Sequence, residues 1–428
     1  MKSDEQTCGV TALEVQTDRA LGRAGQRKLR YLRIGLQAAQ AERETERWPV
    51  QVAFALDRSG SMRGEKMSVA RVAVSAALRR LKADDHFAIT AFDDKIDVVA
   101  KAGRASPEGL EAARRALGTV NARGSTALHG GWDAACAELA SVRRSEAVAR
   151  CILVTDGRAN CGIKGVAELA EAARQRRAQG IATTTLGIGV DFHEELLAAM
   201  SRAGGGQFYY VQDARQLEAI LTAAISEAMD VVARGVVVEL WPSPGVRLEV
   251  LSDYPTVWTG THLRIEVGDL VSDQRLELLA TVRLPAGHEG EKPSVEVRAS
   301  DAEGPLELPV QLVSWQLTTS DANDLQPLDL TVLRPVAGML AARVLLDVLE
   351  RNRRGEFVQL QQRIDAVIET LRELAPDDPE IHKHIENLLL ERHQLSTYAD
   401  EVSLKKRHMD GTQLARSKMP DGSSRRGS

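Results

Sequence analysis

Cysteines and aromatic residues are scarce in this chain. Of its 428 residues, 4 are cysteines, at positions 8, 136, 151 and 161, and 4% are Phe, Trp or Tyr. The cysteines form no C-x-x-C pair and have no histidine spacing beside them, which argues against a zinc knuckle. Scattered cysteines in a chain of this length are typical of a reducing compartment, so we expect a cytoplasmic location. The low aromatic content argues against a surface that stacks nucleic-acid bases.

Long uncharged stretches and an excess of basic charge are also missing. The longest uncharged runs have 13 residues, at 178–190 and 308–320. A membrane-spanning helix needs about 20 apolar residues, so a membrane channel or transporter is excluded. Residues 1–6 are polar and no apolar run follows Lys2, so we expect no secretory signal there. The formal net charge of −5 argues against a dedicated nucleic-acid-binding protein.

Apolar residues are plentiful, and they indicate folded domains. The chain is 43% apolar and 27% charged, a composition that excludes global disorder. Its length suggests two or three domains of roughly 150 residues each, with room for sizeable cores.

The middle of the chain is predicted to be an α/β domain. Residues 50–56 form a near-continuous apolar run that ends at Asp57, and residues 151–155 form a second run that ends at Asp156. Such runs suit strands that are buried on both faces of a parallel sheet. Strands and helices alternate from there to residue 232, which predicts a doubly wound, mostly parallel sheet.

The rest of the chain follows other patterns. Residues 235–318 hold short alternating strands separated by Pro, Gly and Asp, which predicts an antiparallel β-sandwich. Residues 29–36 alternate in the same way, so we expect this strand to pair with the sandwich and the α/β domain to be inserted into it. Beyond residue 325, apolar residues recur at helical spacing. The predicted division is a flexible N-terminus at 1–28, a strand of the sandwich at 29–45, the α/β domain at 46–232, the β-sandwich at 233–320, a helical hairpin or bundle at 325–398 and a disordered tail at 399–428.

A cluster of oxygen-bearing side chains follows the first buried strand. Asp57, Ser59 and Ser61 share one short loop, at the end of the sheet where doubly wound domains bind ligands. Thr126, in the sequence G-S-T-A-L, precedes a predicted helix, and Asp156 ends the second buried strand. Oxygen-only sites suit hard cations, of which Mg²⁺ takes about six ligands. These five residues are therefore the candidate metal ligands.

The motifs resemble those of the von Willebrand factor A domain. That family has a metal-ion-dependent adhesion site made of D-x-S-x-S after an apolar strand, a threonine loop and T-D-G after another strand, and all three stand here. Residues 204–211 also resemble the last strand of the family, so the resemblance covers about 48–230.

The resemblance implies a role for each of the five residues. Ser59, Ser61 and Thr126 would ligate the metal through their hydroxyl groups, and Asp57 and Asp156 would hold it mostly through water. The implied metal is Mg²⁺, with Mn²⁺ or Ca²⁺ as alternatives. One coordination position would stay open for an Asp or Glu of a partner protein. The implied function is a cytoplasmic interaction or adaptor module, not an enzyme.

The order of the flanking parts is similar to that of bacterial proteins described as von Willebrand A-containing or calcium-activated-chloride-channel-like. Relatives of this kind often work beside AAA+ ATPases, or beside protein kinases and phosphatases, so the resemblance implies a partner of one of these classes. They also often carry a signal or a membrane anchor, which we do not expect in this sequence. Nucleic acid and membrane are not expected partners.

Two other functions stay open at this point. A metal-dependent phosphohydrolase of the haloacid-dehalogenase type needs a second carboxylate two residues after its first Asp, where Ser59 stands. Ser59 as a nucleophile would need a histidine base. His86 is expected at the opposite end of the sheet. His129 could lie on the face of the site, although a lone surface histidine is the preferred interpretation. The other function is a scaffold whose metal only stabilises the fold, and a site that folds without binding metal is open as well.

Basic residues are expected to surround the metal. The loops predicted at that face carry Arg58, Arg63, Lys66, Arg123, Arg158 and Lys164, against Glu65, Asp191, Glu194 and Glu195. We expect this basic rim to attract an acidic partner segment and to act mainly on its association rate. The alternative is an ordinary solvated surface. Asp93 and Asp94 are expected to shape a hairpin turn and not to bind metal.

Overall fold

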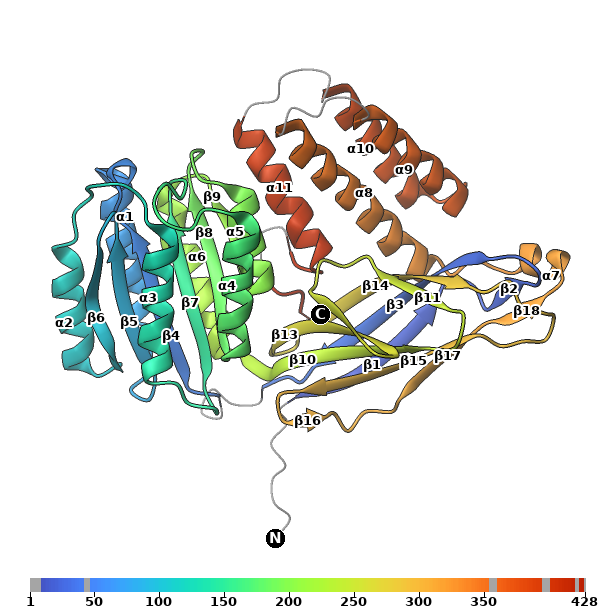
Figure 1. Ribbon diagram of the computed structural model, residues 1–428, viewed down its shortest axis with the longest axis horizontal. Helices are drawn as coiled ribbons and strands as arrows, with labels where there is room; N and C mark the ends of the chain where they lie inside the picture. The colour runs from blue at the N-terminus through green and yellow to red at the C-terminus, as the bar shows by residue number, and fades with distance from the viewer. Residues whose placement is uncertain (1–8, 42–46, 354–359, 395–400, 420–422, 427–428) are drawn as a thin grey trace, which may run out of the picture.

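The computed structural model describes residues 9–41, 47–353, 360–394, 401–419 and 423–426. Figure 1 shows an α/β domain beside a β-sandwich, with a group of helices packed over the sandwich. The predicted order of an α/β domain, an antiparallel sandwich and C-terminal helices is therefore confirmed.

The sheet of the α/β domain lies within residues 47–353, which are described without a gap. It has six strands in the order β6-β5-β4-β7-β8-β9. The strands are β4 (Val50–Asp57), β5 (His86–Phe92), β6 (Ile96–Arg104), β7 (Val148–Thr155), β8 (Ile181–Ile188) and β9 (Gly205–Val211). Neighbouring strands are parallel except β6, which runs antiparallel to β5. Every residue of β4 and β7 is buried, which explains their long apolar runs.

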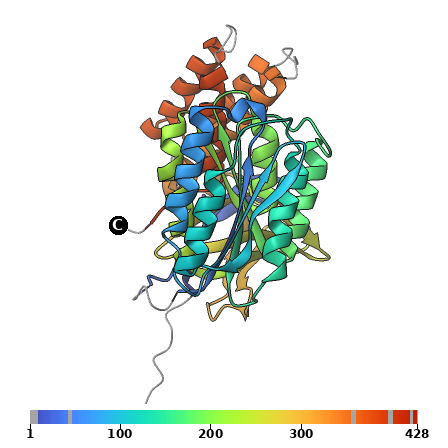
Figure 2. The same cartoon turned by 90° about the vertical axis from the view of Figure 1, so that its left-hand side faces the viewer.

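Helices cover both faces of this sheet (Figure 2). One face shares its core with α1 (Glu65–Leu78), α2 (Pro107–Gly118) and α6 (Leu217–Met229). The other face packs against α3 (Leu128–Ser141), α4 (Val166–Ala178) and α5 (Glu194–Ala203). The arrangement is the predicted doubly wound one, and it brings the loops that follow the strands to one edge of the sheet.

Two antiparallel sheets form the sandwich around a shared apolar core. The first has the order β1-β3-β14-β11 and the second has the order β12-β13-β10-β15-β16, with β17 also paired to β15. The strands of the first are β1 (Val10–Thr17), β3 (Lys28–Ala38), β11 (Arg247–Val250) and β14 (Arg275–Leu284). Those of the second are β10 (Val231–Pro242), β12 (Thr256–Thr259), β13 (His262–Val271), β15 (Ser294–Asp301), β16 (Gly304–Pro305) and β17 (Gln311–Ser314). The short strands β2 (Leu21–Arg23) and β18 (Gln316–Thr318) pair in parallel beside them.

The α/β domain is inserted into the sandwich. β3 lies between β1 and β14 and pairs with β14 along its whole length. The chain leaves the sandwich after β3, forms the α/β domain and returns in β10 directly after α6. The prediction of a flexible segment at 1–28 is wrong for β1 and β2. The reason is that β1 is an edge strand in which only Leu13 is buried and Val10 and Val15 are partly buried against the core, so its apolar signal is weak.

The C-terminal part of the chain is helical. Its helices are α7 (Ser320–Leu325), α8 (Leu330–Arg353), α9 (Leu360–Leu374), α10 (Pro379–Gln394) and α11 (Glu401–Ala415). The apolar stripes of α8, α9 and α10 form one core with Tyr31, Leu251 and Leu279 of the sandwich. Within the described residues, no helix combines the length and the apolar composition that a bilayer crossing needs.

Helix α11 corrects the prediction of a disordered tail at 399–428. It lies between α8 and the α/β domain (Figure 1). The buried Lys405 donates a 2.9 Å hydrogen bond to the carbonyl oxygen of Phe192 and forms a 2.5 Å ion pair with Glu194. Such polar contacts stabilise the helix in its place, and a hydropathy pattern does not show them.

The same segment covers the edge strand β9. The Gln413 amide donates to the carbonyl oxygen of Phe208 at 2.8 Å, and the Arg416 guanidinium donates to the carbonyl oxygen of Gly206. These carbonyl groups lie on the last strand of the sheet. An uncovered edge strand is a template for unwanted pairing, so the polar side chains protect it.

Replacing Leu36 with Ala should lower the free energy of unfolding by about 3 kcal/mol, because the Leu36 side chain is buried in the sandwich core. Leu29→Ala changes the same residue type on the same strand, but Leu29 is 38% exposed, so its loss should stay below about 1 kcal/mol. Equilibrium unfolding in urea measures both. Equal losses would contradict the placement of β3 in the core.

Candidate metal centre

The five candidate ligands come from the carboxyl edge of the sheet. Asp57 is the last residue of β4, and Ser59 and Ser61 follow it in a loop that includes a short 3₁₀-helix. Asp156 directly follows β7, the strand that pairs with β4. Thr126 lies in the loop before α3. The parallel pairing of β4 with β7 therefore places the two carboxylates side by side, and the third loop brings the threonine to them.

Hydrogen bonds connect the side chains of the centre. The Ser61 hydroxyl donates to Asp156 Oδ1 at 2.6 Å, and the Ser59 and Ser61 hydroxyl oxygens are 3.1 Å apart. Asp57 Oδ1 accepts from the Ser59 backbone N–H at 2.7 Å. Asp57, Ser59, Thr126 and Asp156 are buried, whereas Ser61 is exposed. The structure thus brings the five residues together in one centre that opens to the surface at Ser61.

The oxygen atoms converge on one point beside Gly157. A Cβ atom built on Gly157 would lie 3.5 Å from Thr126 Oγ1, 3.6 Å from Ser61 Oγ and 3.9 Å from Asp57 Oδ2. Carboxylate and hydroxyl oxygens are the ligands that suit Mg²⁺ and other hard cations. The described residues contain no group of three His, Cys, Asp or Glu side chains that could hold a metal, so a metal held here would need hydroxyl ligands as well.

Burial sets the electrostatics of Asp57. It raises the pKa of Asp57 to about 6, although hydrogen bonds from Thr155 and Ser59 favour the charged carboxylate. The neighbouring Asp156 carboxylate raises the pKa further. A cation held between the two carboxylates would favour their charged forms, so the centre is suited electrostatically to a positive ion.

The loop that carries Thr126 is held by a residue that the motif does not contain. The Asn160 side-chain oxygen accepts a 2.7 Å hydrogen bond from the Thr126 backbone N–H, and the Asn160 N–H donates back to the Thr126 carbonyl oxygen at 3.1 Å. A second connection joins the Gly60 N–H to the Gly124 carbonyl oxygen at 3.1 Å. The threonine loop is therefore fixed against both of the loops that follow β4 and β7.

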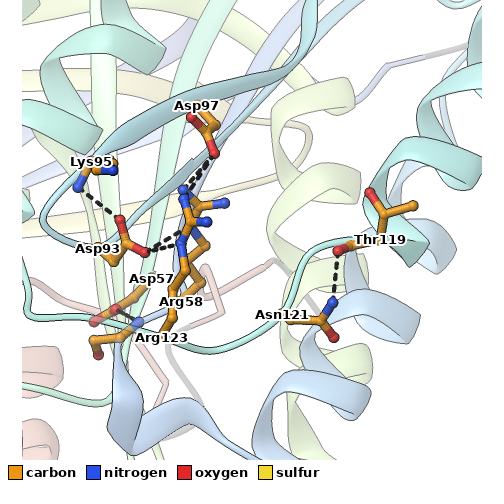
Figure 3. Close-up of polar contacts among 9 residues, drawn as sticks. Asp57, Arg58, Asp93, Lys95, Asp97, Thr119, Asn121 and Arg123 are labelled. Carbon is orange, nitrogen blue, oxygen red and sulfur yellow. Dashed lines mark hydrogen bonds and ion pairs between the residues drawn. The ribbon is translucent and has the colours of Figure 1, made fainter.

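A network of charged side chains lies beside the centre (Figure 3). Arg58 and Arg123 both contact the carboxylates of Asp93 and Asp97. The Arg123 N–H also donates to the Arg58 carbonyl oxygen at 2.7 Å. Asp93 accepts from the Lys95 backbone N–H at 2.7 Å, so it also shapes the hairpin turn between β5 and β6. This network joins the Asp57 loop to the threonine loop.

The basic rim differs from its prediction. Arg58 is buried and Arg123 is paired, so the acidic network compensates both charges. Lys66, in the first turn of α1, forms an ion pair with Asp156 and therefore belongs to the centre itself. Glu194 is buried in its ion pair with Lys405 and does not line the rim. Three of the six predicted basic residues, Arg58, Lys66 and Arg123, are thus paired with acidic groups of the domain.

Sequence analysis missed the roles of three neighbours. Thr155 stands inside the T-D-G motif, and its hydroxyl donates to Asp57. Asn160 follows the same motif, and Lys66 follows D-x-S-x-S. Closeness to the motifs was a signal for all three, but their contacts depend on how the loops fold.

His86 begins β5 and pairs with Gln51, so it lies at the edge of the sheet opposite Asp57.

A family comparison identifies the domain that carries this centre. Residues 51–223 match the model of the von Willebrand factor type A domain. The chain contains a von Willebrand factor type A domain. The six-stranded sheet, the helices on both faces and the D-x-S-x-S loop at its carboxyl edge are the parts of this chain that the match covers.

Solved structures extend the likeness to the whole chain. A von Willebrand factor type A protein from Catenulispora acidiphila matches with a TM-score of 0.73 and 20% identity, over 98% of this chain and 99% of that one. The ArnB paralog VWA2 from Sulfolobus acidocaldarius matches with a TM-score of 0.62 and 16% identity, over 95% and 98%. The arrangement of the A domain, the sandwich and the helices is therefore a shared fold.

Two bacterial relatives match part of this chain in sequence. An uncharacterized protein of Synechocystis sp. is 24% identical over 60% of this chain, and the uncharacterized protein YfbK of Escherichia coli is 22% identical over 60%. The alignments cover 62% and 45% of these relatives' own lengths. The chain thus matches less than two thirds of either protein.

Replacing Asn160 with Ala should lower the free energy of unfolding by about 1–2 kcal/mol, because the Thr126 N–H loses its partner in a part-buried loop. Asn121→Ala is the matched control, since the Asn121 amide donates only to the exposed Thr119 carbonyl oxygen (Figure 3). Its effect should stay within about 0.5 kcal/mol. Urea unfolding in EDTA measures both, and equal effects would show that Asn160 does not hold the loop.

Proposed function

We propose that the A domain of this chain binds a divalent cation and uses it to dock an acidic residue of a partner protein. Asp57, Ser59, Ser61, Thr126 and Asp156 would hold the ion, with Mg²⁺ as the expected metal and Mn²⁺ or Ca²⁺ as alternatives. The observation that carries the proposal is the convergence of Thr126, Ser61 and Asp57 oxygens within 4 Å of one point beside Gly157. The bound ion would supply a positive charge that attracts a carboxylate.

The chain's own residues would fix the geometry of docking. The Asp57 and Asp156 carboxylates are buried at the ends of rigid, paired strands, so they cannot follow an ion that moves outward. Ser61 is exposed, so a partner would approach over its hydroxyl group. Since the charges of Arg58 and Arg123 are compensated by Asp93 and Asp97, the attraction of an acidic segment would come chiefly from the ion.

The sandwich and the helices would serve as the platform of an adaptor. The resemblance to bacterial von Willebrand A proteins favours an AAA+ ATPase, a protein kinase or a phosphatase as the partner class. The scattered cysteines favour a cytoplasmic setting. No observation favours the alternative phosphohydrolase, because the position two residues after Asp57 carries Ser59 and His86 lies at the opposite edge of the sheet.

Replacing Gly157 with Ala should abolish Mg²⁺ binding and leave the fold intact. The added methyl group would lie 3.5–3.9 Å from the three oxygens, so it would not clash with them but would crowd an ion bound among them. Gly60→Ala is the matched control, because its added methyl group would lie 3.6 Å from the Gly124 carbonyl oxygen and from no candidate ligand. Isothermal titration calorimetry with MgCl₂ measures the affinity.

Two outcomes would contradict the proposal. Unchanged Mg²⁺ affinity in Gly157→Ala would place any metal elsewhere, and an absence of binding in the unmodified protein would leave no metal centre. Docking is tested by affinity capture from the source organism in Mg²⁺ and in EDTA. A true partner is retained by the unmodified protein in Mg²⁺ and is lost both in EDTA and with Gly157→Ala. A scaffold with a structural metal would retain the same proteins in every arm.

A further inference from the structure

Lys66 brings a positive charge of the chain's own into the candidate metal centre. It lies in the first turn of α1, and its ammonium group forms an ion pair with Asp156 Oδ2. The side chain passes over the end of β8, where a Cβ atom built on Gly189 would lie 3.8 Å from Lys66 Nζ. The side chain is 31% exposed, whereas that of Asp156 is fully buried. The lysine can therefore reach the buried carboxylate and still withdraw toward solvent.

The two carboxylates of the centre, Asp57 and Asp156, differ in how their negative charges are compensated. Both oxygens of Asp156 are engaged, one by the Ser61 hydroxyl group and the other by the Lys66 ammonium group. Within the described residues, the hydrogen bonds to Asp57 come from neutral donors, the Ser59 N–H and the Thr155 hydroxyl group. An unpaired buried charge is costly. Lys66 therefore compensates one of the two negative charges, and the centre keeps a net charge of one negative unit.

We propose that Lys66 is a tethered counter-ion that keeps the metal-free centre folded and weakens its affinity for a divalent cation. This inference rests on the proposed metal function. The ammonium group and the ion would both be attracted to Asp156, so each makes the other's binding less favourable. With Lys66 in place, a divalent cation leaves the centre with an excess positive charge. Without Lys66, the same cation neutralises the two carboxylates.

This arrangement weakens binding of the ion, so the ion can be released, and the domain stays stable after its release. Because the fold does not depend on the ion, the docking surface can be switched by the metal without unfolding the loops. The excess positive charge also favours an added carboxylate from a partner, since that group restores neutrality. Lys66 is thus a residue that sets metal affinity, while the oxygen ligands set metal geometry.

The test replaces Lys66 with Met, which keeps the length of the side chain and removes its charge. Titration calorimetry with MgCl₂ and with MnCl₂ should show about tenfold tighter binding in Lys66→Met, because a unit charge at this range has been removed from a partly buried site. Thermal unfolding in EDTA should show a lower Tm for Lys66→Met than for the unmodified protein. Saturating Mg²⁺ should raise the Tm of Lys66→Met by more than it raises that of the unmodified protein.

Lys164→Met is the matched control, because it removes the same charge from an exposed position on a neighbouring loop. Solvent and salt screen that charge, so its metal affinity and its Tm in EDTA should stay unchanged. Equal metal affinities in Lys66→Met and in the unmodified protein would overturn the inference and leave the metal centre in place. An absence of Mg²⁺ and Mn²⁺ binding in both proteins would instead overturn the proposed function and this inference with it.

Discussion

The parallel pairing of β4 with β7 is the constraint on which the candidate centre depends. Both strands are buried along their whole length, so packing on both faces of the sheet holds them in place. Asp57 and Asp156 stand at these ends and are carried side by side to one edge of the sheet. Burial raises the energy of both charged carboxylates, and their mutual repulsion adds to this cost. The paired strands nevertheless hold the two carboxylates close together, and the surrounding hydrogen-bond donors compensate the cost.

The loops around the two carboxylates compensate their negative charge in two layers of contacts. Hydroxyl groups and backbone N–H groups contact the carboxylates directly, and Lys66 supplies the one cation that reaches Asp156 within the described residues. Farther out, Arg58 and Arg123 share Asp93 and Asp97 and join two loops to each other. The inner layer sets the charge of the centre, and the outer layer sets its shape.

The rest of the chain is built around the A domain. The domain is inserted between β3 and β10 of the sandwich, so both of its covalent connections lead to the same platform. Helix α11 adds a third connection, because Lys405 contacts Phe192 and Glu194 after β8. Arg158, next to the T-D-G loop, donates to the Asp191 carbonyl oxygen in this same segment. One loop of the domain therefore contacts both the C-terminal helix and the surroundings of the metal centre.

The sequence by itself determined the elements whose signals are local. The apolar runs at 50–56 and 151–155 predicted the buried strands, and the oxygen-bearing residues after them predicted which side chains would meet. Tertiary structure alone decided the contacts of Lys66, Asn160 and α11. Each is a polar contact between segments far apart in the chain, or depends on how a loop turns. Hydrophobic periodicity reports which face of an element is buried, and it carries no information about which partner a buried charge will find.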